Sequence, residues 1–183
     1  MAKRDKKSDF IKSSFEYMVK VGLENTSVRD LCRETKISSG SMYYWFDGKD
    51  DIYISAAKYG VGYVVDEIFK YIFKSMKSID LFFDNFISEI DKYKNELRLV
   101  FQITTSPVFG PRMRKKAEDF KVIYEDYINK LGQFLGCGAE KMEPIIYMLI
   151  SVTVDYVTWE DTPVTRMQLD FLKQTVKNML DNN

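Results

Sequence analysis

The residues with the clearest chemical potential lie between Thr26 and Lys49. A run of small residues, Ser38 to Ser41, would let the start of a helix approach another molecule closely. Its hydroxyl and free amide groups can bond phosphate oxygens or base edges. Tyr43 and Tyr44 follow, with rings able to pack on sugars or a thymine methyl group and hydroxyls able to reach phosphate. We therefore predict a DNA-contacting set: Thr26, Ser27, Lys36, Ser38, Ser39, Gly40, Ser41, Tyr43, Tyr44 and Lys49.

Several neighbours of this set have a structural alternative. Met42 and Phe46 are expected in the core, whereas Trp45 could lie in the core or on the DNA side. Arg29 and Arg33 share a helix face and could either contact DNA phosphates or only face solvent. The segment from Ser38 to Phe46 holds no Arg, Asn or Gln, the residues that make bidentate base contacts. Sequence preference would then rest on Tyr, Ser, Lys36 and DNA shape.

Two short helices are predicted to position these residues. Val28, Leu31 and Cys32 share one helical face, and Ser27 with Asp30 forms an acidic variant of the capping box. Ser38 caps a second helix after a short break, which predicts a helix-turn-helix.

A preceding amphipathic helix is predicted from Asp9 to Val21. Ile11, Phe15 and Met18 form its apolar face, and Gly22 ends it. Three helices are the smallest arrangement that buries all three apolar faces.

The stretch from Phe10 to Ile52 resembles the DNA-binding domain of the tetracycline-repressor (TetR/AcrR) family. The resemblance rests on these positions: Gly22, Thr26-Ser27-Val28, Ile37 to Tyr43, Phe46 and Lys49. Ser14 and Cys32 replace the family's usual alanine, and Lys36 replaces a frequent glycine, so the turn must form without glycine's freedom. The resemblance implies a homodimer, a palindromic double-stranded DNA operator and a small-molecule effector.

A long helix is predicted from Asp50 to about Lys74. Gly60 and Gly62 lie in its middle and are explained either by close helix packing or by a bend. The resemblance favours the bend, because the family's fourth helix transmits ligand binding to the DNA-reading domain.

Aromatic residues are dense in the helical segments Ile79–Lys94, Glu96–Thr105 and Arg112–Phe134. Each residue alone is explained by the core, but together such side chains can leave an apolar cavity. The resemblance implies that this cavity binds the effector. The candidate lining residues are Phe86, Tyr93, Phe101, Met113, Phe120, Tyr124, Tyr147 and Asp155.

The last two predicted helices, Glu143–Trp159 and Thr165–Leu180, complete the chain. The first is apolar nearly all round, so it is either central or covered by another subunit. In the family, the last two helices pair with their copies in the dimer. Asp155 could pair across that interface, face a cationic ligand in the cavity, or face water.

Composition bounds the remaining possibilities. Hydrophobic residues make up 45% of 183, with only 4 Pro and 9 Gly, so we predict an all-α fold of about nine helices. Its first part, 1–49, would be the helix-turn-helix domain, and 50–183 an antiparallel helical effector-binding and dimerisation domain. The basic tail Met1–Ser8 is either disordered or a contact for phosphates.

Catalytic and targeting signals are not evident in the sequence. The chain has no His, 2 Cys, no metal-ligand cluster and no nucleophilic triad, so no enzyme activity, metal or cofactor is expected. The longest apolar run, 145–159, contains Asp155 and is too short for a membrane helix. With no signal peptide, a cytoplasmic location without membrane association is expected.

The leading hypothesis is a homodimeric transcriptional regulator, a repressor, released from its operator by a small, largely apolar or aromatic ligand. Two alternatives stay open. One is a helical protein for apolar ligands whose helix-turn-helix is incidental, and the other is a DNA-binding protein without an effector.

Overall fold

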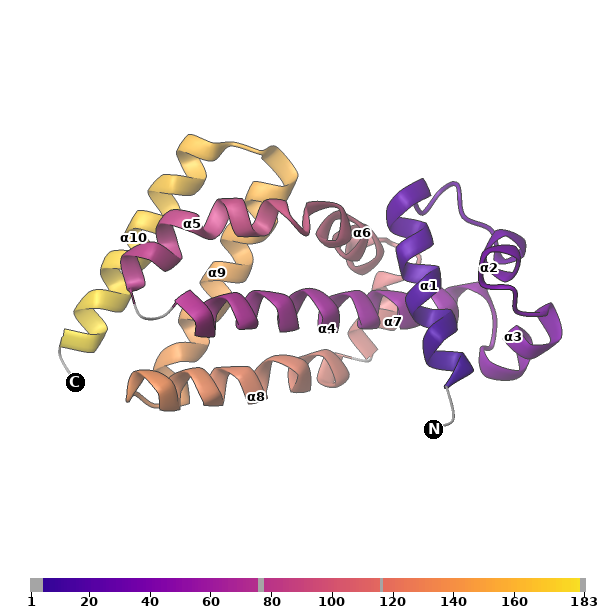
Figure 1. Ribbon diagram of the computed structural model, residues 1–183, viewed down its shortest axis with the longest axis horizontal. Coiled ribbons are helices and arrows are strands. Elements are labelled where there is room, and N and C mark those ends of the chain that lie inside the picture. Colours follow the sequence, from indigo (N-terminus) through magenta and orange to yellow (C-terminus); the bar gives the residue numbers. More distant parts are fainter. Residues whose placement is uncertain (1–4, 76–77, 116, 182–183) are drawn as a thin grey trace. The chain divides into compact units, whose positions relative to one another are not determined.

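The computed structural model describes residues 5–75, 78–115 and 117–181 (Figure 1). These parts contain ten α-helices and no strand, which confirms the all-α prediction. The helices are α1 (Lys6–Val21), α2 (Val28–Thr35), α3 (Ser39–Trp45), α4 (Lys49–Ser75), α5 (Ile79–Asp91), α6 (Lys94–Thr105), α7 (Gly110–Lys115), α8 (Ala117–Leu135), α9 (Ala139–Trp159) and α10 (Thr162–Asp181).

The chain divides into two compact units. Unit 1 comprises Met1–Tyr63 and Asn95–Ala117, and unit 2 comprises Val64–Lys94 and Glu118–Asn183. Helix α4 contributes its first part to unit 1 and its last part to unit 2. The functional boundary after Lys49 stays a prediction, because compactness does not report which residues bind DNA.

In unit 1, α1 begins earlier than the apolar pattern indicates. The Asp5 carboxylate accepts hydrogen bonds from the backbone N–H groups of Lys7 (3.1 Å) and Ser8 (3.4 Å), so it caps a helix that starts at Lys6. The helix ends at Gly22 with φ 89°, as predicted. Lys3 and Arg4 of the predicted basic tail lie outside the described residues.

Gly60 allows α1 and α4 to pack closely. A Cβ atom placed on Gly60 would lie 2.3 Å from Cε2 of Phe15, a ring that is itself buried. No described atom lies within 4 Å of a Cβ placed on Gly62. The glycine pair was explained either by close helix packing or by a bend, and the environment of Gly60 supports close packing.

The pair provides an internally controlled prediction. Gly60→Ala should lower the free energy of unfolding by about 1–3 kcal/mol, because the buried Phe15 ring must move. Gly62→Ala should raise it by about 0.5–1 kcal/mol through helix propensity alone. Urea unfolding followed by circular dichroism measures both. Equal effects of the two substitutions would contradict the packing explanation.

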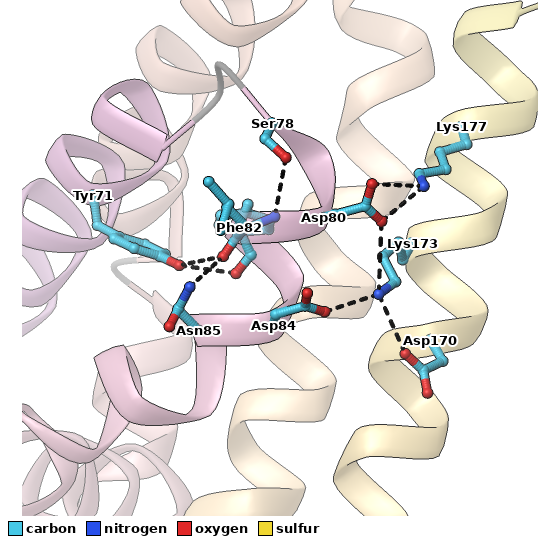
Figure 2. Close-up of polar contacts among 10 residues, drawn as sticks. Tyr71, Ser78, Asp80, Phe82, Asp84, Asn85, Asp170, Lys173 and Lys177 are labelled. Carbon is cyan, nitrogen blue, oxygen red and sulfur yellow. Dashed lines mark hydrogen bonds and ion pairs between the residues drawn. The ribbon is translucent and has the colours of Figure 1, made fainter.

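In unit 2, α10 packs on both α9 and α5. Ion pairs connect α10 to α5 (Figure 2): Lys173 lies 2.9 Å from Asp84, and Lys177 lies 2.7 Å from Asp80. Tyr71 of α4 donates a 2.8 Å hydrogen bond to the Phe82 carbonyl of α5. The ion pairs are partly exposed, so they orient the helices more than they stabilise them.

Three predicted boundaries differ from the structure. The single segment expected over Arg112–Phe134 is divided into α7 and α8. Helix α9 starts at Ala139. Pro144 was predicted in the first turn of this helix but lies beyond that turn. Helix α10 starts at Thr162 and accommodates Pro163 in its first turn, where an N–H group would have no helical partner.

Candidate DNA interface and effector cavities

Helix α2 begins with the predicted capping box. The Ser27 hydroxyl accepts from the Asp30 N–H (3.2 Å), and the Asp30 carboxylate accepts from the Ser27 N–H (3.2 Å). The Ser27 hydrogen bonds hold the pKa of Asp30 below its usual value. Arg33 forms a 2.7 Å ion pair with Asp30 within α2, so the Asp30 carboxylate partly offsets the positive charge of Arg33. Arg29 is exposed.

The turn between α2 and α3 forms without glycine. Lys36 takes the left-handed conformation, with φ 56° and ψ 30°, and its N–H donates to the Arg33 carbonyl (3.4 Å). The next N–H, of Ile37, donates to the Cys32 carbonyl (3.1 Å). These bonds satisfy the end of α2, at a conformational cost of about 1–2 kcal/mol for a residue with a Cβ.

We expect Lys36→Gly to change the free energy of unfolding by between zero and about +1 kcal/mol. Relief of the left-handed strain is partly offset by the greater freedom of glycine in the unfolded chain. Lys12→Gly, at an exposed position inside α1, is the control and should cost about 1 kcal/mol. Chemical denaturation compares them. A loss at Lys36 as large as at Lys12 would show that the turn is unstrained.

Helix α3 presents its N-terminus to solvent. The Ser38 hydroxyl caps it by accepting from the Ser41 N–H (3.2 Å), while Ser39 and Gly40 are exposed. Tyr43 and Tyr44 are 63% and 86% exposed, so both rings are available to a partner.

The other aromatic residues around α3 are on its packed side. Met42 and Phe46 are buried, as predicted. The Trp45 ring lies 6.3 Å from that of Phe10 between centroids, so it packs toward α1. Helix α3 thus has one buried face and one exposed face that carries hydroxyl groups.

Thr26 has a structural role that the sequence did not indicate. It is buried, and its hydroxyl donates to the Gly22 carbonyl (2.8 Å). Its own carbonyl accepts from the buried Tyr53 hydroxyl (2.6 Å). The Thr26 side chain is therefore withdrawn from the DNA-contacting set. The hydrogen bond from the Tyr53 hydroxyl to the Thr26 backbone carbonyl connects the loop before α2 to α4.

The start of α4 carries charges of both signs. Lys49 is exposed, with its Nζ 5.0 Å from the centre of the Tyr53 ring. Asp50 pairs with Arg112 of α7 at 3.0 Å. No local pattern in the sequence indicated this ion pair, because 62 positions separate the two residues.

The structure distributes the predicted effector residues over several places. Phe101 and Met113 belong to unit 1, and Phe86, Tyr93, Tyr124, Tyr147 and Asp155 belong to unit 2. The side chain of Phe120 lies outside the described set.

Within unit 2, the predicted residues fall into separate groups. Phe86 and Tyr124 line one cavity, whereas Tyr147 and Asp155 line a groove along α9 and α10. Tyr93 donates a 3.2 Å hydrogen bond to Glu67.

The interior cavities identified in unit 2 are small. One has a volume of about 60 Å³ and a neighbouring one about 30 Å³. Ile72, Ile146 and Leu149 line both, so these three side chains separate them. Burial raises the pKa of Tyr124, beside the larger cavity, to about 12, which keeps its hydroxyl protonated. Pockets for drug-sized ligands are several times larger, about 300–1,000 Å³.

The groove on α9 and α10 is larger, with a volume of about 790 Å³. Its lining includes Met167 and Phe171, which are 66% and 69% exposed. The Asp155 carboxylate accepts a 3.1 Å hydrogen bond from Gln168, so it has a polar partner within its own chain. The two helices thus expose an apolar surface next to a polar pair.

Among the described residues, no group of three or more His, Cys, Asp or Glu side chains is placed to hold a metal ion. None of the described helices is long and apolar enough to cross a membrane.

Solved structures share this fold. One described as a transcriptional regulator, SCO7518 from Streptomyces coelicolor A3(2), aligns with a TM-score of 0.68 at 11% identity and covers 93% of this chain and 98% of that one. The fatty acid degradation regulator FadR from Bacillus halodurans aligns with a TM-score of 0.58 at 16% identity, covering 95% of each chain. At these identities the likeness shows the fold alone. No curated protein sequence matches the chain.

The family model for bacterial regulatory proteins of the tetR family matches residues 10–56, from α1 into the start of α4. Residues 10–56 therefore form a DNA-binding domain of the kind found in tetR-family regulatory proteins.

Proposed function

We propose that the protein is a homodimeric repressor that binds a palindromic operator and is released by a small, largely apolar or aromatic ligand. The observation that carries the DNA-binding part is the exposed N-terminus of α3 with Tyr43 and Tyr44 beside it. The proposed contacts are Ser27, Lys36, Ser38, Ser39, Gly40, Ser41, Tyr43, Tyr44 and Lys49. In this proposal, residues 1–49 read DNA, and 50–183 bind the effector and the second subunit.

The exposed apolar surface of α9 and α10 supports dimerisation. Met167 and Phe171 on α10 and Tyr147 on α9 present large side chains to solvent, and burying them against a second copy removes apolar area from water. A two-fold dimer places two copies of α3 on half-sites about 34–36 Å apart, or multiples of that.

Ligand control is proposed to act through α4, whose residues up to Tyr63 belong to unit 1 and whose residues from Val64 onward belong to unit 2. Because the interior cavities are small, an effector must displace side chains such as Ile146 and Leu149, which favours an alternative conformation of unit 2. The DNA affinity then falls, by at most the ratio of the ligand's affinities for this alternative conformation and for the DNA-binding conformation. The proposal assigns the protein no catalytic role.

The same small cavities favour a second candidate function, a DNA-binding protein without an effector. Thermal-shift screening with small apolar and aromatic compounds separates the two. Under the leading proposal, at least one compound raises the unfolding temperature and also weakens operator binding. If no compound does so across a broad collection, the effector-independent function is favoured.

Footprinting on DNA upstream of the protein's own gene tests the geometry of binding. We expect two protected half-sites related by two-fold symmetry and separated by whole helical turns. A single asymmetric footprint, or protection without a preferred position, would contradict the dimeric operator complex.

A further inference from the structure

A separate groove lies within unit 1, between α1, α4 and α6. Its volume is about 280 Å³, several times that of either interior cavity of unit 2. The lining residues are Lys12, Phe15, Glu16, Val19, Tyr59, Tyr63 and Glu96. None of them belongs to the proposed DNA-contacting set.

Aromatic rings form one wall of the groove. The rings of Tyr59 and Tyr63, one turn apart on α4, are parallel within 4°, with centroids 6.3 Å apart. Phe15 meets Tyr59 edge-on, with centroids 5.6 Å apart, and can lie this close to α4 because residue 60 is glycine. The face of a tyrosine ring carries negative π-electron density, which attracts cations.

The charged residues of the groove give it a net negative charge. Glu16 and Glu96 supply two carboxylates, against one ammonium group from Lys12. The Lys12 ammonium lies 3.9 Å from Glu16, and both side chains are more than half exposed, so this ion pair is weak and easily displaced. Burial raises the pKa of Tyr59, and the negative charge of Glu16 raises it further.

We propose that this groove binds a small organic cation that carries a flat aromatic ring. The ring would lie on the Tyr59 and Tyr63 wall, with its charge near Glu16 and Glu96. Phe15 and Val19 would cover its apolar part. A compact, strongly hydrated metal ion would use the carboxylates but leave the tyrosine rings without a partner. All residues that line this groove belong to unit 1, whereas the residues that line the interior cavities belong to unit 2.

N-Methylquinolinium and the uncharged 2-methylquinoline form a suitable pair of probes, because they share a ring system and differ in charge. Calorimetric titration of the full-length protein at low ionic strength should detect binding of N-methylquinolinium and at least tenfold weaker binding of 2-methylquinoline. Equal affinities for the two probes, or no binding of the cation, would overturn the proposal.

Three variants locate the site. The double substitution Glu16→Gln with Glu96→Gln, and separately Tyr63→Leu, should each weaken N-methylquinolinium binding by about tenfold or more. Glu125→Gln, at an exposed acidic position in α8, is the matched control and should leave the affinity unchanged. Circular dichroism confirms that each variant is folded.

If the cation binds but the groove variants keep wild-type affinity, the site lies elsewhere and the proposal is wrong. Operator binding without ligand, measured in the same preparations, tests the proposed regulator separately. Failure of cation binding with intact operator binding rejects only this groove.

Discussion

Replacement of Tyr43 with alanine is expected to weaken operator binding by about a hundredfold. Each protomer would lose one ring and hydroxyl contact worth about 1–1.5 kcal/mol, and the dimer contains two copies. Because Tyr43 is 63% exposed, the substitution removes little packing within the protein. Fluorescence anisotropy with labelled operator DNA measures the loss, and thermal unfolding checks that the protein remains folded.

Val108→Ala is a suitable control, because Val108 is also 63% exposed and lies in unit 1, outside the predicted DNA-contacting set. Its operator affinity should match the wild type. If Tyr43→Ala also keeps wild-type affinity, α3 is not the recognition helix and the proposed contacts must be reassigned.

Replacement of Phe171 with aspartate is expected to convert the proposed dimer to monomers. The side chain is 69% exposed in one chain, so the fold should tolerate the change. In a dimer, however, the interface would bury two carboxylates without partners, one from each subunit. We expect dimer affinity to fall at least a hundredfold, to roughly micromolar or weaker. Sedimentation velocity over a concentration series measures this directly.

The loss of dimerisation should also lower operator affinity, because a monomer binds only one half-site. Val122→Asp, at a position in α8 that is 64% exposed, places the same charge outside this surface and should leave the dimer intact. A wild-type protein that sediments as a monomer at all concentrations, or a Phe171→Asp dimer of normal affinity, would contradict an interface built from α9 and α10.

The helix-turn-helix could be predicted in detail because its signals are local. Gly22 ends α1, Ser27 and Asp30 cap α2, and Ser38 caps α3, each through contacts within four residues along the chain. The left-handed turn at Lys36 follows from the same local geometry. Such features depend little on distant packing, so sequence alone indicates them.

Features that depend on distant partners could not be predicted in this way. The use of Thr26 within the loop requires Tyr53, and the tight packing at Gly60 requires Phe15. The aromatic residues of α5 to α9 predicted one cavity, but periodicity does not report which side chains fill space. The small cavities of unit 2 result from how Ile72, Ile146 and Leu149 pack together.

The most direct test of specific regulation is an anisotropy titration of the purified wild-type protein across a range of salt concentrations. DNA from upstream of the protein's own gene is compared with random DNA of equal length. We predict that the upstream DNA binds at least a hundredfold more tightly near physiological salt, while both affinities fall as salt rises. Equal affinity for the two DNAs at every salt concentration would contradict a sequence-specific regulator.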